Sequence, residues 1–134
     1  MQSAFRLALI TAALCLSAGA QAQSSLNLGN YQVTGNHTLA SLGGMGLEAS
    51  AVAYARDRGS LFVVGDEGLG VVEVSLTGQT LGTMAFNWAG TGSTHNDAEG
   101  LTYLGNGKLV VVDERPQVAY QFTYSAGSTL ALND

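Results

Sequence analysis

The chain has 134 residues, of which 18 are glycine, one is proline and one is cysteine, and its formal net charge at pH 7 is −5. With only five lysines and arginines, the composition excludes the basic surface that nucleic acids or anionic lipids require. Apolar residues make up 46% of the sequence, which excludes an intrinsically disordered chain. Glycine-rich stretches between short runs of valine, leucine, threonine and tyrosine instead predict an all-β protein with many tight turns.

Residues 1–22 have the pattern of a secretory signal peptide. A short segment with one positive charge precedes an almost wholly apolar run over residues 7–16, and small residues follow up to Ala22. The apolar run is too short to span a bilayer, and no later segment of the sequence has the pattern of a transmembrane helix. We therefore expect cleavage after Ala22, which removes Cys15, the only cysteine. The mature protein is expected in the periplasm or outside the cell, where it could associate with the cell envelope.

Three segments follow the leader. Residues 23–46 are expected to form an N-terminal segment with weak strands around 32–34 and 38–40. The next unit, residues 47–90, has apolar runs that predict strands at 51–54, 61–64, 71–76 and 81–86. The last unit, residues 95–134, predicts strands at 101–103, 109–112 and 118–124, and a run at 129–132 begins a fourth. No helix is expected after the leader, because no stretch there keeps a 3.6-residue apolar period.

The two strand-rich units repeat one another about 48 residues apart. The segments EASAVAY and SLFVVGDEG of the first unit correspond to DAEGLTY and KLVVVDERP of the second, so that Tyr54 aligns with Tyr103. This alignment also places Asp66-Glu67 opposite Asp113-Glu114. A repeat of this length, made of short β-runs, is typical of propeller blades. We therefore predict about two four-stranded antiparallel blades of an incomplete β-propeller, whose uncovered sheets favour self-association.

Carboxylates recur at corresponding positions of the two units. In an antiparallel blade, the residues before the innermost strand and after the next strand lie at the same end. Glu48, Asp97 and Glu99 precede the innermost strands, at the expected mouth of the central channel, and they are the predicted metal ligands. Crowded carboxylates raise one another's pKa unless a cation neutralises them, and oxygen ligands without cysteine or paired histidine favour calcium or magnesium. A second group follows the second strands and comprises the candidate ligand-binding residues Asp66, Glu67, Asp113, Glu114 and Arg115.

Simpler interpretations of the same residues stay open. The four carboxylates of the second group also fit turn residues that accept backbone hydrogen bonds, and Arg115 fits a surface ion pair. His95 is near the cluster in sequence, and a solvated loop histidine explains it better than a base or a ligand does. Tyr54 and Tyr103 are best explained by packing between blades.

The segments LEASAVAY, LFVVGDEG, DAEGLTY and LVVVDERPQVAYQF resemble the SdiA-regulated family of bacterial envelope β-propellers. The resemblance covers about residues 47–130 and looks like the N-terminal portion of such a protein. It implies a propeller with calcium at its channel and no established reaction. One departure is Ala51, where the family's first motif commonly has glycine, as the second motif has at Gly100. The resemblance maps the family's acidic motifs onto Glu48, Asp66, Glu67, Asp97, Glu99, Asp113, Glu114 and Arg115.

Three classes of function stay open. The favoured class is an envelope protein that binds calcium or a ligand, either a small molecule or an envelope component. The second is a metal-dependent esterase, lactonase or phosphoesterase, since phytase-like propellers share D-x-E-G motifs; calcium would polarise a substrate oxygen and a carboxylate or His95 would act as base. No nucleophile motif such as G-x-S-x-G is present, so no catalytic residue is assigned. The third class is a structural interaction module.

Overall fold

The computed structural model describes residues 27–39, 42–91 and 97–132, and the chain divides into two units, 1–34 and 35–134. The described part of the first unit contains one short 3-10 turn, η1 (Leu28–Asn30), which Asn27 caps by accepting a hydrogen bond from the amide of Gly29 at 3.0 Å. The predicted leader lies outside the described residues. The weak strands predicted at 32–34 and 38–40 are wrong for the described positions, because residues 31–39 have no regular secondary structure.

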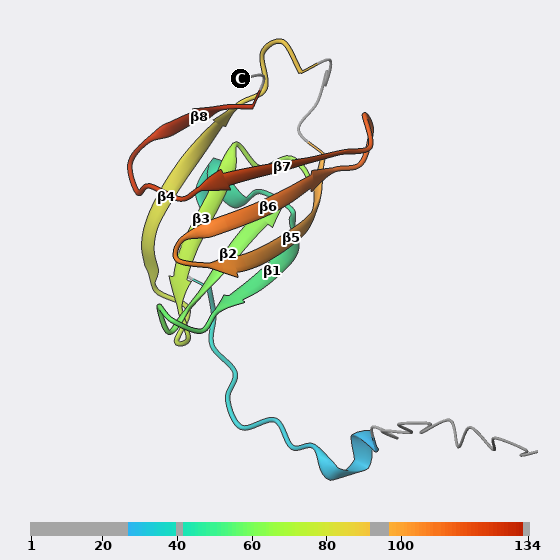
Figure 1. Cartoon of the computed structure of the whole chain (residues 1–134). Coiled ribbons are helices and arrows are strands. Elements are labelled where there is room, and N and C mark those ends of the chain that lie inside the picture. Colours follow the sequence, from blue (N-terminus) through green and yellow to red (C-terminus); the bar gives the residue numbers. More distant parts are fainter. Residues whose placement is uncertain (1–26, 40–41, 92–96, 133–134) are drawn as a thin grey trace, which may run out of the picture. The chain divides into compact units, whose positions relative to one another are not determined.

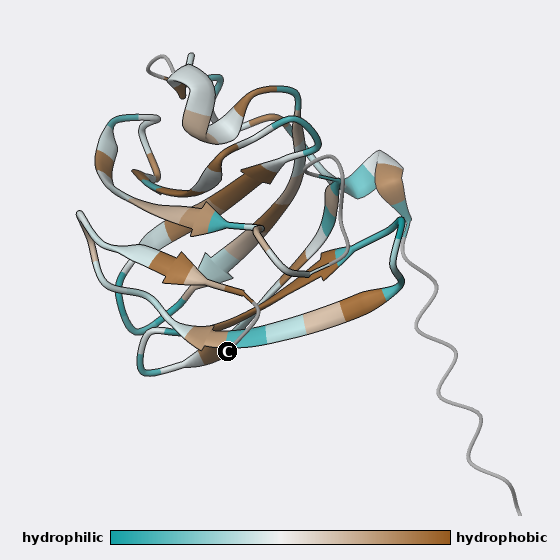
Figure 2. Cartoon of the chain, turned by 90° about the horizontal axis from the view of Figure 1, so that it is seen from above, coloured by the Kyte–Doolittle hydropathy of each residue, from teal (hydrophilic) through white to brown (hydrophobic). Residues whose placement is uncertain are grey.

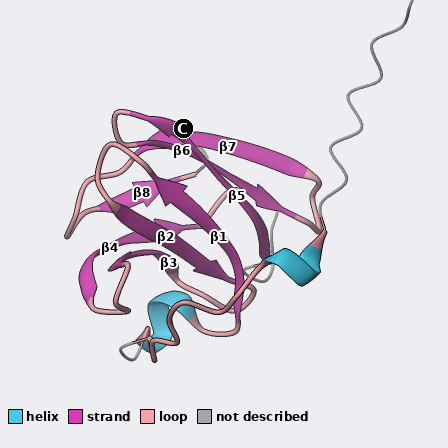
Figure 3. Ribbon diagram, turned by 90° about the horizontal axis from the view of Figure 1, so that it is seen from below, coloured by secondary structure: helices cyan, strands magenta, loops and turns pink. Residues whose placement is uncertain are grey.

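The described part of the second unit is built from two β-sheets, whose strands pair antiparallel except for one parallel pair, and this confirms the all-β prediction (Figure 1). The first sheet has the order β1-β2-β3-β4-β8 and the second the order β5-β6-β7. Figure 3 shows the helical segments of the described residues, which are the short 3-10 turns η1 and, in the second unit, η2 (Gly43–Gly46). The strands are β1 (Ala49–Ala55), β2 (Ser60–Gly65), β3 (Gly70–Ser75), β4 (Thr80–Asn87), β5 (Ala98–Gly105), β6 (Lys108–Asp113), β7 (Val118–Thr123) and β8 (Thr129–Ala131).

Turn chemistry explains where the strands reverse. β5 and β6 are joined by the two-residue turn Asn106-Gly107, and both residues have positive φ, 52° and 75°. A two-residue hairpin turn with both φ values positive is favoured by asparagine followed by glycine, because its twist matches that of the strands. The sequence therefore fixes this hairpin locally.

The last strand joins a different sheet from the one expected. The run at 129–132 was predicted to begin the fourth strand of the second unit, beside β7, but β8 pairs in parallel with β4 of the first sheet. The segment after β7 bonds to β4 on its way: the amide of Gly127 donates to Thr83 O at 2.7 Å, and the amide of Ala85 donates to Ser128 O at 2.9 Å. This path buries both Tyr124 and Leu132 in the core. Burial of apolar surface thus decides the pairing, and a strand pattern alone does not reveal it.

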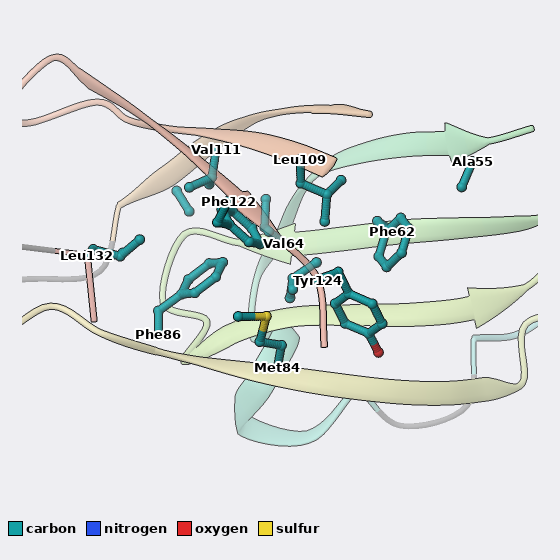
Figure 4. Packing of buried hydrophobic residues seen from close by; sticks show 12 residues of the cluster. Ala55, Phe62, Val64, Met84, Phe86, Leu109, Val111, Phe122, Tyr124 and Leu132 are labelled. Atoms are coloured by element: carbon teal, nitrogen blue, oxygen red, sulfur yellow. The ribbon is translucent and has the colours of Figure 1, made fainter. Parts of the chain in front are cut away.

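The main hydrophobic core lies between the two sheets. Figure 4 shows Phe62, Val64, Met84 and Phe86 of the first sheet and Leu109, Val111 and Phe122 of the second among the buried side chains of this cluster. Aromatic rings join the sheets: Phe86 and Phe122 meet edge to face at 5.3 Å between centroids, and Phe62 stacks on Tyr103 at 5.6 Å. Figure 2 shows hydrophobic residues along the strands that contribute to this core.

The hairpins β1–β2 and β5–β6 contain the strands that the sequence predicts to be innermost, and the registers of these two innermost hairpins are equivalent. Tyr54 pairs with Leu61 and Tyr103 pairs with Leu109, while Ala49 pairs with Gly65 and Ala98 pairs with Asp113. In both hairpins the register shifts by one residue near the start, at Ser50 in β1 and at Glu99 in β5, which is the signature of a β-bulge. The repeat is therefore real in three dimensions.

This register corrects the sequence alignment of the acidic pairs. The prediction matched Asp66-Glu67 with Asp113-Glu114. In the structure Gly65 pairs with Ala49 and Asp113 pairs with the equivalent Ala98, so Gly65 is the equivalent of Asp113. Asp66 is then the equivalent of Glu114. Identical letters misled the alignment by one residue, because the register is set by how the strands pair and not by the identity of single side chains.

Candidate metal site

The backbone at one end of each innermost hairpin is held in the same way in both repeats. The amide of Asp66 donates to the carbonyl of Glu48 at 3.0 Å, and the amide of Glu114 donates to the carbonyl of Asp97 at 3.0 Å. In the first repeat, the Ser50 hydroxyl donates to Glu48 O at 2.9 Å and accepts from the Asp66 amide at 3.0 Å. These bonds fix the carboxylate-bearing residues at the ends of β1, β2, β5 and β6.

Three carboxylates from the two sheets converge at this end. Asp66 follows β2 of the first sheet, whereas Asp97 precedes β5 and Glu99 lies on the bulge of β5 in the second sheet. One oxygen from each of Asp66, Asp97 and Glu99 lies within 4.8 Å of the others. Asp97 is buried, Asp66 is half-buried and Glu99 is exposed, so the cluster opens to solvent on the Glu99 side. We call Asp66, Asp97 and Glu99 the acidic cluster.

The acidic cluster carries more negative charge than its surroundings neutralise. The pKa of Asp66 is raised from 3.8 to about 6, first because its carboxyl group hydrogen-bonds to Asp97, then because of partial burial and repulsion from Asp97, Glu99 and Glu48. One cation balances part of this charge: Arg115 Nε lies 2.8 Å from Asp97 Oδ2. Asp97 therefore lies between an arginine and an aspartic acid that holds a proton more readily than usual.

The structure places the other predicted site residues at different points around this cluster. Glu48 contributes repulsion to Asp66 but is outside the group whose oxygens lie within 4.8 Å. Glu67 and Glu114 are exposed, while Asp113 is fully buried at the end of β6, at the position that Gly65 occupies in β2. Arg115 forms an ion pair, as the simpler interpretation expected, with Asp97. His95 lies outside the described residues.

The sequence interpretation missed two polar contacts at the opposite end of the hairpins. Asp57, in the turn between β1 and β2, accepts hydrogen bonds from the Tyr103 hydroxyl at 2.9 Å and from the Asn106 amide at 3.0 Å. The Tyr103 hydroxyl in turn accepts from the Gly107 amide at 2.9 Å. Asp57 thus links the turns of the two sheets, and its pKa is lowered chiefly by the bond from Tyr103. Tyr103 packs between the sheets as expected, whereas Tyr54 is 52% exposed.

The second missed contact surrounds Glu73 on β3. Arg58 donates two hydrogen bonds to this carboxylate, Nε to Oε1 and Nη2 to Oε2, both at 2.8 Å, and the Ser60 hydroxyl donates to Oε1 at 2.7 Å. The guanidinium also lies over the rings of Phe62 and Tyr124, at 5.8 and 5.7 Å from their centroids. The spacing of Arg58 and Glu73, 15 residues apart, carries no local motif by which a sequence could reveal the pair.

Two packed sheets with a repeated innermost hairpin define a β-protein of the blade-repeat type, with an acidic end where the hairpins meet. The model of the SdiA-regulated family matches residues 23–133. The chain therefore belongs to the SdiA-regulated family. Among the described residues, no helix is long and apolar enough to cross a membrane.

Proposed function

We propose that this chain is an exported calcium-binding protein of the SdiA-regulated family, with the cation held by Asp66, Asp97 and Glu99. The observation that carries the proposal is the convergence of three carboxylate oxygens from two sheets to within 4.8 Å. The raised pKa of Asp66 supports it, because a bound cation would offset the repulsion from Asp97, Glu99 and Glu48 that contributes to this rise.

The donor set favours calcium over other cations. The acidic cluster offers only hard oxygen ligands, and calcium accepts six to eight such ligands in flexible geometry at about 2.3–2.6 Å. Three side chains leave coordination positions for Glu48, for water or for oxygens of a bound ligand. Sites of this kind bind in the range of about 10⁻⁴–10⁻³ M in extracellular modules, which suits a protein that works outside the cytoplasm.

Export and ligand binding are part of the same proposal. The family match begins at residue 23, directly after the predicted leader, and this supports a mature protein located in the periplasm, outside the cell or at the envelope. A calcium ion with open coordination positions would take up carboxylate, phosphate or hydroxyl oxygens of a small molecule or an envelope component.

A calcium titration of the melting temperature tests the proposal. Ligands that bind only the folded state stabilise it by RT ln(1 + [L]/Kd), so calcium at about ten times Kd adds about 1.4 kcal/mol, a rise of several degrees for a small domain. Glu99→Gln keeps the size of the side chain and removes one charged ligand, so the rise should disappear. Glu67→Gln removes an exposed carboxylate outside the cluster and should leave the rise intact. A wild-type curve that about 10 mM calcium, ten times the upper end of this Kd range, does not move would end the proposal.

A further inference from the structure

The contact between the two sheets is directional. The first sheet contributes Phe62 and Val64 to this contact, and the second sheet contributes Leu109 and Val111. The register makes Leu109 and Val111 the equivalents of Leu61 and Val63, which lie on the other side of β2. Each sheet therefore has a front face, of the Phe62 and Val64 type, and a back face, of the Leu61 and Val63 type. The front face of the first sheet packs on the back face of the second.

One face of each sheet takes no part in this contact. The back face of the first sheet carries Val52 and Tyr54, 60% and 52% exposed, next to Leu61. The turn η2 covers part of it, because Leu42 and Met45 pack near Val72 and Val74 on the β3 side. On the β1–β2 side a groove of about 280 Å³ stays open, lined in part by Leu39, Val52, Leu61 and Val63.

The front face of the second sheet is the complementary surface. It carries Val110 and Val112, the latter 40% exposed. A groove of about 510 Å³ runs over this face, lined in part by Gly100, Val112, Val118 and Ala119. By the register of the repeat, Val110 and Val112 are the equivalents of Phe62 and Val64, the residues that already form a sheet-to-sheet contact within the chain.

We propose that two copies of this chain stack head to tail. The front face of the second sheet of one copy packs on the back face of the first sheet of the other copy. The repeat indicates that the partner is a second copy. Tyr54 and Leu61 are equivalent to Tyr103 and Leu109, and within the chain Tyr103 and Leu109 pack against the front face of the first sheet. In that contact Tyr103 stacks on Phe62 at 5.6 Å, and in the stack Tyr54 meets Val110 of the second copy. Contacts between unlike faces propagate into rings or filaments.

Charge makes this contact weak and dependent on salt. Within the chain, the equivalent contact brings Asp66, at the end of β2, close to Asp97, which precedes β5. The corresponding residues in the stack are Glu114 of one copy and Glu48 of the next, and both are carboxylates. Screening by salt reduces their repulsion, so association increases with ionic strength.

Sedimentation velocity of the full chain over two decades of concentration tests the stack, with a chelator present so that cation binding plays no part. The wild type should associate as concentration rises, and more so at high salt. Val52→Lys blocks the back face and Val112→Lys blocks the front face, and each change should lower the association constant by more than about tenfold. Gln79→Lys adds the same charge at an exposed position outside both faces and should behave as the wild type.

A mixture of the two blocked variants separates this arrangement from a symmetric one. Each variant keeps one intact face, so an equimolar mixture should form dimers and nothing larger, although each variant alone is monomeric. A variant that still associates alone would show that like faces meet, which overturns the proposal. A monomeric wild type, or a mixture that stays monomeric, would overturn it too and show that something other than a second copy covers these faces. Tyr54→Lys on the back face and Ala119→Lys, at an exposed residue that lines the front-face groove, form a second pair if circular dichroism shows that either first variant is unfolded.

Discussion

Glu73 is a buried carboxylate whose charge is fully matched by its neighbours. Arg58 and Ser60 supply three hydrogen bonds to its two oxygens, and the guanidinium of Arg58 also lies over the rings of Phe62 and Tyr124. The bonds from Arg58 lower the pKa of Glu73 below its ordinary value of 4.5, against the opposing effect of burial. The pair therefore joins the β1–β2 turn to β3 and contributes to stability through the ionised form.

Replacing Glu73 with Gln should lower the free energy of unfolding by about 1.5–3 kcal/mol at neutral pH, the usual range for hydrogen bonds to charged groups. Because the folded pKa is depressed, this contribution is fully present above pH 4.5 and is lost as pH falls through the folded pKa. Urea unfolding of both proteins at a series of pH values measures it. The difference should be constant near neutral pH and shrink in acid. Glu67→Gln, at an exposed position, should show neither effect, and a difference that grows in acid would contradict the assignment.

The residues of the acidic cluster could be predicted only in part from the sequence. Strand order alone places Glu48, Asp97 and Glu99 at one end of the hairpins, and Asp97 and Glu99 do lie together there. The choice of Asp66 over Glu48 as their third neighbour depends on β-bulges at Ser50 and Glu99 and on a one-residue register. Those features arise from packing and backbone hydrogen bonds, which residue spacing does not encode.

At the scale of elements, the end of β2 lies against the segment that carries Glu48. A Cβ on Gly65 would overlap the carbonyl oxygen of Leu47 and lie 2.8 Å from its carbonyl carbon. Both obstacles are backbone atoms, which cannot rotate away as a side chain can. Gly65 therefore permits the close approach that lets the Asp66 amide reach the Glu48 carbonyl.

Gly65→Ala should lower the free energy of unfolding by about 1–3 kcal/mol, as overpacking of a close contact does. It should also weaken calcium binding, because displacing the end of β2 moves Asp66 away from Asp97 and Glu99. Gly44→Ala is the matched control, since a Cβ there meets only Leu69 Cδ1 at 3.6 Å, an ordinary contact. Chemical denaturation and a calcium titration measure the two effects. A Gly65→Ala variant as stable as the wild type would contradict this prediction, because the segment before β1 would then move aside without a cost in stability.

The elements themselves were predictable where local pattern decides them. Alternating apolar runs and glycine turns gave β1 to β7 with ends displaced by a few residues, and Asn106-Gly107 gave its hairpin. β8 was placed on the wrong sheet, because its partner depends on the burial of Tyr124 and Leu132 between the sheets. The weak strands expected before η2 do not form at the described positions. Pairing across long sequence separations is a tertiary property and leaves little trace in local sequence.

At the scale of the second unit as a whole, the two sheets depend on one core. Side chains of both sheets share a single buried cluster, with Leu109 and Val111 fully buried against the first sheet. Asp57 joins the turns at one end, and the carboxyl groups of Asp66 and Asp97 lie close together at the other. Neither sheet can lose this contact without exposing the core of its neighbour, so the two should unfold together.

Leu109→Ala tests this dependence from within the second sheet. Leu109 is fully buried, and truncation of a buried leucine costs about 2–5 kcal/mol, whereas Leu104→Ala, at a residue 52% exposed, should cost far less. Trp88, the only tryptophan, contacts Phe86 of β4 at 5.6 Å and Tyr120 of β7 at 5.9 Å between ring centroids, so its fluorescence reports on the junction of the sheets. Urea unfolding at low protein concentration, followed by this fluorescence and by far-ultraviolet circular dichroism, should give coincident transitions that Leu109→Ala shifts equally. Two separate transitions, or a shift in only one signal, would show that the sheets are stable independently.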